Sequence, residues 1–135
     1  MKRLIGFAAV LVALFLSNNI FAQDLTFELN GKKYEAAKND LEGRYTYDQA
    51  RAGCEGLVDP DDFNEDWFLP SKEELNAMYE QLHKKGVGGF ANFFYWSFPE
   101  FEDDENLAWG QNFSSGYQGY GSKDGIYYVR CVRAL

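Results

Sequence analysis

Apolar and polar residues follow a strand-like pattern in two neighbouring stretches near residue 30. The first stretch is Leu25 to Leu29, and the second, residues 32–36, follows the pair Asn30-Gly31. An Asn-Gly pair between two such runs is typical of a two-residue β-hairpin, because both turn positions need a positive φ. We therefore expect a hairpin over residues 25–36.

Two later stretches show helical spacing, and each begins with a capping box. Thr46 and Gln49 form the first box, and Ser71 and Glu74 form the second. In a capping box the first residue caps the helix and the fourth reaches back to the backbone of the first. Apolar residues recur at helical spacing after both boxes. We expect helices over residues 47–55, ending near Gly56, and from residue 72 to the basic turn at residues 84–86.

The second half of the chain changes to strand-like patterns. We expect strands over residues 93–98, 107–113, 117–122 and 125–133, with an acidic loop at 99–105 and a tight turn at 114–116. A strand hairpin, two helices and then a run of antiparallel strands is typical of an α+β domain.

The first 22 residues are typical of a secretory signal peptide. Lys2 and Arg3 precede an unbroken apolar run over residues 4–16, which is too short to span a bilayer, and Ala22 offers a small residue at the cleavage position. A retained membrane anchor is the alternative. We expect a single exported domain over residues 23–135, located in the periplasm, at the cell surface or in the medium.

The net charge argues against negatively charged partners. The whole chain carries a formal net charge of -8, and removal of Lys2 and Arg3 makes it more acidic by two units. So acidic a chain is unsuited to nucleic acids and to anionic membranes. We expect no nucleic-acid partner and no membrane insertion after signal cleavage.

The two cysteines of the chain lie in distant predicted elements. Cys54 falls in the first helix, and Cys131 falls in the closing strand, where alternation places it on the same face as Tyr127 and Val129. Two cysteines in an exported chain fit one disulfide. Such a bond would join the last strand to the first helix and would stabilise the fold by roughly 4 kcal/mol in the chain-entropy model.

Acidic residues gather in two loops, of which the second is a candidate calcium site. Calcium takes six to eight oxygen ligands, which clustered carboxylates and backbone carbonyls can supply. A solvated acidic loop is the alternative, since no EF-hand spacing is present. The candidate ligands are Glu100, Glu102, Asp103, Asp104 and Glu105. We expect the first acidic loop, at residues 59–66, to be solvated.

Aromatic residues supply the candidate binding surface. Tyr117 and Tyr120 lie beside glycines and, with Asn106, are candidate ligand-binding residues, because flat rings stack on sugar rings or on a partner protein. An aromatic edge strand that covers the sheet is the alternative. We expect Trp96 and Trp109 to be core residues and His83 to be a solvated cation at a helix end.

Nothing in the sequence supports catalysis. With one histidine, no Gly-x-Ser-x-Gly motif and both cysteines assigned to a disulfide, the chain lacks the groups of a hydrolase triad. We expect a non-enzymatic protein.

Three ordered blocks resemble a bacterial domain family. They are DWFLPSKEEL at residues 66–75, YWSFPE at 95–100 with AW at 108–109, and YVRCVR at 128–133. In order and spacing they resemble the C-terminal domain of the Legionella collagen-like adhesin, and they are similar to the Fibrobacter-type major paralogous domain. The family pattern has arginine where this chain has Phe68, and Ser-Thr where it has Phe98-Pro99.

The resemblance implies a fold and a general role. It implies a C-type lectin-like architecture, related to the formylglycine-generating enzymes, with two helices on a twisted antiparallel sheet and a bond from first helix to last strand. It also implies an adhesion-type binding module for an extracellular glycan or surface protein. The alternative is a structural component of the bacterial cell envelope that has no small ligand.

Overall fold

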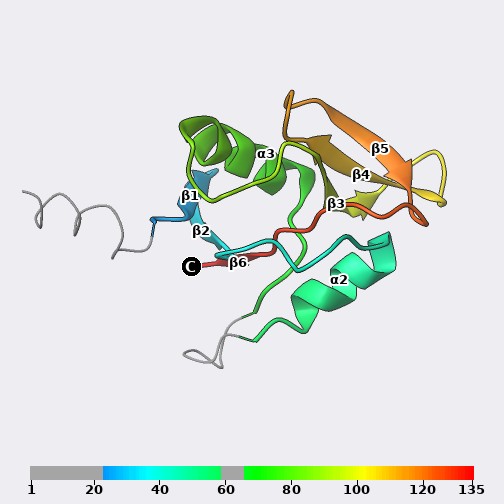
Figure 1. Cartoon of the computed structure of the whole chain (residues 1–135), viewed down its shortest axis with the longest axis horizontal. Helices are drawn as coiled ribbons and strands as arrows, with labels where there is room; N and C mark the ends of the chain where they lie inside the picture. Colours follow the sequence, from blue (N-terminus) through cyan, green and yellow to red (C-terminus); the bar gives the residue numbers. More distant parts are fainter. Residues whose placement is uncertain (1–22, 59–65) are drawn as a thin grey trace, which may run out of the picture.

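The computed structural model describes residues 23–58 and 66–135. Within this part the chain forms two three-stranded antiparallel sheets, two α-helices and one 3-10 turn (Figure 1). The elements are β1 (Thr26–Leu29), β2 (Lys32–Ala36), α2 (Tyr47–Glu55), α3 (Lys72–Gln81), η1 (His83–Lys85), β3 (Phe94–Glu100), β4 (Leu107–Asn112), β5 (Gln118–Ser122) and β6 (Val132–Ala134). The α+β class and the two predicted helices are confirmed.

The first sheet has the strand order β1-β2-β6, so the first and last described strands belong to one sheet. The predicted hairpin is present, with φ of 53° at Asn30 and 79° at Gly31, and Phe27 pairs with Tyr34 across it. The rings of Phe27 and Tyr34 stack at 5.5 Å on the buried face of the hairpin.

The second sheet has the strand order β3-β4-β5. One of its faces is lined with small residues, which lets aromatic rings approach the backbone closely. A Cβ at Gly110 would lie 2.4 Å from the ring of Phe94, and one at Gly121 would lie 3.1 Å from the ring of Tyr127. These two glycines are therefore needed where the rings pack onto the sheet.

Both helices begin with the capping boxes that the sequence predicts. The side chain of Ser71 accepts a hydrogen bond from Glu74 N (3.0 Å), while the Glu74 carboxylate accepts one from Ser71 N (2.8 Å), and Thr46 and Gln49 repeat the arrangement. The helices lie on opposite sides of the C-terminal segment (Figure 1).

Two clusters of buried side chains form the core. The first lies between α3 and the first sheet and includes Leu75, Met78 and Val132. The second surrounds the Cys54–Cys131 disulfide and includes Tyr47 and Trp96. The disulfide prediction is confirmed, and the bond joins α2 to the residue that precedes β6.

The closing strand is shorter than the sequence predicts. The extended stretch expected at residues 125–133 forms a ladder only in β6, and its earlier part makes isolated bridges from Tyr127 to Tyr45 and from Tyr128 to Tyr95. The reason is that this segment crosses from one sheet to the other. Its backbone bonds to the loop at residues 37–45 and to β3, so no single partner strand runs alongside it.

His83 and Trp109 also differ from expectation. His83 is half-buried among aromatic rings, 5.3 Å from that of Phe113, and its Nε2 lies 2.9 Å from Asn92 Oδ1. Trp96 is a core residue as expected, but Trp109 is half-buried in a surface cluster with Phe101 and Tyr120. The spacing of residues in the sequence does not show which face of a strand or helix other elements cover in the fold.

The predictions for the signal peptide and for residues 59–65 of the first acidic loop lie outside the described residues. Within the part that the structure describes, no helix has the length and apolar character needed to cross a membrane.

Candidate functional site

A concave surface opens between the loop at residues 38–44, the turn at Gly88-Gly89 and the C-terminal segment. Its hollow measures about 640 Å³. It adjoins a second hollow of about 310 Å³, because Arg44 and Tyr128 line both. We call the two hollows together the groove.

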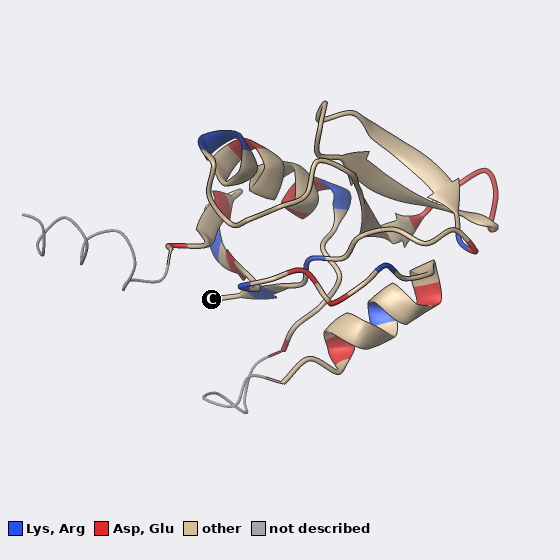
Figure 2. Ribbon diagram, in the orientation of Figure 1, with Lys and Arg blue, Asp and Glu red and all other residues tan. Residues whose placement is uncertain are grey.

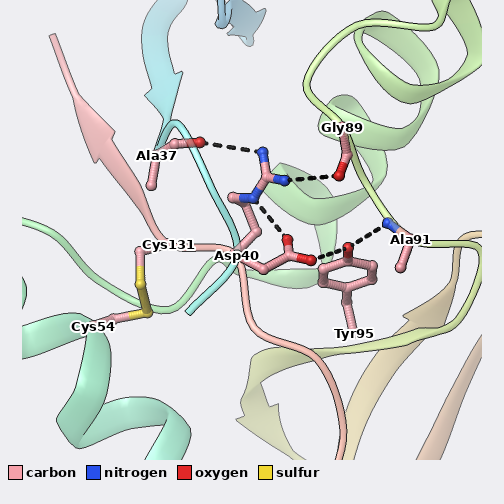
Figure 3. Close-up of polar contacts among 8 residues, drawn as sticks. Ala37, Asp40, Cys54, Gly89, Ala91, Tyr95 and Cys131 are labelled. Carbon is pink, nitrogen blue, oxygen red and sulfur yellow. Dashed lines mark hydrogen bonds and ion pairs between the residues drawn. A yellow bond between two sulfur atoms is a disulfide. The ribbon is translucent and has the colours of Figure 1, made fainter. Parts of the chain in front are cut away.

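Arg130 lines the groove and joins its walls through hydrogen bonds. Its side chain is only 1% exposed, and its Nε donates to Asp40 Oδ1 at 2.8 Å (Figure 3). Its remaining nitrogens donate to the carbonyls of Ala37 (3.2 Å) and Gly89 (3.4 Å), and its guanidinium lies 4.0 Å from the centre of the Phe90 ring. A buried charge is tolerated when it is paired and hydrogen-bonded in this way.

Tyr95 completes this network beneath the groove. Its hydroxyl donates to Asp40 Oδ2 (2.9 Å) and accepts a hydrogen bond from Ala91 N (2.8 Å). Burial, followed by the nearby charge of Asp40, raises the pKa of Tyr95 far above its usual value. The hydroxyl therefore stays protonated and keeps donating to the carboxylate. The network fixes the loop at 37–44 and the turn at 88–91 to the C-terminal segment, which is a structural task.

The rim of the groove carries exposed polar side chains. Lys38, Asn39, Glu42 and Arg44 are exposed, and within the described residues their side-chain groups have no hydrogen-bond or ion-pair partner. They include donors, acceptors and both signs of charge. Such groups on a loop that is itself well anchored are available to a ligand.

An aromatic wall borders the second hollow. The ring of Phe93 is 59% exposed and stacks on that of Tyr128 at 5.5 Å and 8°. Phe94, Tyr127 and the exposed Ile126 extend this wall. The groove thus joins a flat apolar surface to a polar rim, which is the usual composition of a small-ligand site.

Tyr117 and Tyr120, predicted together as binding residues, lie on opposite faces of the second sheet. The Tyr117 ring covers Gly119, whereas Tyr120 pairs with Trp109 on the other face and contacts Phe101 at 4.3 Å. Both are exposed, at 72% and 54%. They do not form one surface, and binding at either stays a prediction.

The second acidic loop projects from the end of β3 and β4 (Figure 2). Glu100 is paired with Lys123, whose hydrogen bond holds the pKa of Glu100 below its ordinary value. Glu102 accepts from the Trp109 indole (3.2 Å), and Asp104 accepts from Asn106 N (2.9 Å). Across residues 23–58 and 66–135, no three potential ligands among His, Cys, Asp and Glu converge on a metal position. Calcium binding by the second acidic loop therefore stays a prediction, and the described residues show no cluster of ligands that supports it.

Sequence reasoning missed the network beneath the groove. The available signal was Arg130 itself, a cation between Val129 and Val132 in an apolar stretch, which indicates a buried and paired charge. Asp40 stands in a polar loop that gives no such signal, and the stacked pair Phe93–Tyr128 joins residues 35 positions apart.

Comparison with protein families gives one match. The sequence model of the Lcl C-terminal domain matches residues 22–133 and so covers nearly the whole described part of the chain. A search of curated proteins finds no match.

Proposed function

Because the chain belongs to the Lcl C-terminal domain family, we propose that it is an exported, non-enzymatic binding module that holds a surface glycan in the groove. The family takes its name from the C-terminal domain of the Legionella collagen-like adhesin, and this supports an adhesin-type extracellular role. The buried disulfide supports an oxidising location outside the cytoplasm.

The observation that carries the proposal is the stacked pair Phe93–Tyr128 beside the unpaired polar rim. A sugar ring presents apolar C–H groups on its faces and hydroxyl groups around its edge. The faces suit an exposed aromatic ring, and the hydroxyls suit side chains such as Asn39 and Glu42 that donate and accept. One loop and one aromatic pair would thus contact both parts of the ligand.

Charge favours an uncharged or weakly charged glycan. The rim holds Lys38 and Arg44, but it also holds Glu42, and the chain as a whole carries -8. A polyanion would be repelled by the overall field before it reached two cations. The groove has two carboxylates, Asp40 and Glu42, and Asp40 is already paired with Arg130. We therefore expect binding in the groove to be independent of calcium.

The proposal predicts that truncating the aromatic wall weakens glycan binding. Phe93→Ala removes an exposed ring, and loss of an aromatic anchor typically costs more than about 1 kcal/mol, or roughly five-fold in affinity. We would screen the protein on a glycan array and measure the affinity of the strongest hit by calorimetry. Tyr117→Ala is the matched control, because it also removes an exposed aromatic ring, and this ring lies outside the groove.

The expected result is weaker binding by Phe93→Ala, unchanged binding by Tyr117→Ala and the same affinity in calcium and in chelator. The reverse pattern for the two variants would move the site to the surface around Tyr117, just before β5. Binding abolished by chelator would move it to the acidic loop. An array without any hit would leave the envelope-assembly alternative, which the exposed edge of β5 favours.

A further inference from the structure

The outer edges of the two sheets differ in how they are closed. On β1, the Gln81 amide donates to Glu28 O (2.8 Å) and accepts from Glu28 N (3.1 Å). On β6, Val132 exchanges both backbone bonds with Phe68, each at 2.9 Å. The edge of β3 is closed by backbone bonds with Tyr128. Within the described residues, the edge of β5 has no comparable cover, apart from the turn bond that Ser122 O at its end accepts from Gly125 N (2.9 Å).

The open edge presents a definite set of backbone groups. Asn112 N donates to Tyr117 O and Lys123 N donates to Asn106 O, each at 2.9 Å, and β4 and β5 pair without a bulge between these bonds. Antiparallel ladders alternate, so odd-numbered residues of β5 bond to β4 and even-numbered residues point their N–H and C=O groups outward. The outward residues are Gln118, Tyr120 and Ser122.

This edge lacks the usual protection against pairing with another strand. Proteins protect exposed edges with charged side chains, prolines, bulges or covering segments. The strand Gln-Gly-Tyr-Gly-Ser has no charged residue and no proline, although a quarter of all residues in the chain are charged. Its central residue, Tyr120, is exposed and lies beside the half-buried Trp109.

We propose that β5 is the dimerisation edge of this protein. Two copies pair antiparallel about a two-fold axis at Tyr120 and so form one six-stranded sheet. Each Tyr120 then exchanges N–H and C=O bonds with its counterpart, and Gln118 faces Ser122 of the partner subunit. The outward groups of one copy match those of the other, and the two tyrosine rings lie side by side on one face.

The acidic loops do not prevent two copies from pairing on this edge. The acidic loop lies at the Ser122 end of β5, so the two-fold axis places the two acidic loops at opposite ends of the pair. They are separated by at least about 14 Å along the strand, at about 3.4 Å per residue. This exceeds the screening length of about 8 Å at physiological salt, so uncharged strands meet with little repulsion.

The test is the mass of the protein in solution. The chain is expressed from Met1, purified from the exported fraction and examined by sedimentation velocity over a wide concentration range. We expect the mass to double with concentration. Tyr120→Pro removes the outward N–H and spares the bonds to β4, so it should raise the dissociation constant at least ten-fold above that of Tyr120→Ala. The alanine variant lacks the same ring but keeps the N–H.

Amide hydrogen exchange gives a second measurement that needs no variant. Raising the protein concentration should slow exchange at Gln118 and Tyr120, while Gly119 and Gly121, already bonded to β4, stay unchanged. Added salt should strengthen the dimer, because like-charged copies repel less. The proposal would be overturned if the wild-type protein stays monomeric at all concentrations, or if the amide exchange rate of Tyr120 does not change with protein concentration. Capture of a basic peptide weakened by salt would assign the edge to that partner instead.

Discussion

Arg130 shows how much one side chain contributes to the site. Its guanidinium bonds to Asp40 and to two carbonyls from separate loops, so it positions both walls of the groove. Arg133, three residues on, forms a similar pair with Glu35, but its side chain is 22% exposed against 1% for Arg130. Burial therefore separates the structural cation from the surface one.

We predict that Arg130→Met costs about 3–5 kcal/mol of unfolding free energy, because it leaves Asp40 without its cation in a largely buried position. Arg133→Met is the matched control and should cost less, about 1 kcal/mol, because its ion pair with Glu35 is partly open to solvent. Denaturant unfolding measures both. Equal losses in the two variants would contradict the role of burial. Adding Asp40→Asn to Arg130→Met should restore part of the loss.

At the scale of elements, α3 connects the two sheets. It packs on β1 and β4, its Gln81 closes the edge of β1, and its first carbonyl, Lys72 O, accepts a hydrogen bond from Gln118 (2.8 Å). The start of this helix therefore matters for β5 as well as for the core. A capping box and two acids in the first turn stabilise that start.

We predict that Ser71→Ala lowers the unfolding free energy by about 1 kcal/mol, because the N–H of Glu74 loses its acceptor. Ser71→Gly should cost only a few tenths, since glycine is a tolerated cap. Thermal unfolding of the two variants measures the difference. Indistinguishable melting temperatures for both variants would contradict the capping contribution.

At the scale of the whole molecule, the Cys54–Cys131 bond encloses most of the described fold. The two residues are 77 positions apart, with their Cα atoms 5.4 Å apart, and both are fully buried. Beside this bond the C-terminal segment passes from β3 to β6 and touches both sheets. The disulfide therefore fixes α2 to the segment on which the groove is built (Figure 3).

We predict that the double variant Cys54→Ala/Cys131→Ala lowers the unfolding free energy by about 4 kcal/mol, mainly because the unfolded chain without the bond has more conformational entropy. Native domains are stable by only about 5–15 kcal/mol, so this is a large fraction of the total. Denaturant unfolding of the double variant and of the wild type measures the loss. A loss below about 1 kcal/mol would contradict the prediction.

Local chemistry determined much of this fold directly from the sequence. Turn and cap preferences depend on a few neighbouring residues, so the Asn30-Gly31 hairpin and both capped helices follow from spacing alone. The disulfide partners follow because two cysteines can pair in one way. The family follows from three blocks whose order and spacing are visible in the printed sequence.

Tertiary structure alone decided the parts that join distant residues. The closing segment does not form the expected ladder, because it contacts both sheets in turn. Tyr117 and Tyr120 lie on opposite faces of the second sheet, because strand alternation places residues three apart on opposite faces. The groove depends on Asp40 meeting Arg130 across 90 positions and on Phe93 meeting Tyr128 across 35. Such contacts depend on how the whole chain packs, and no local preference of either residue contains them.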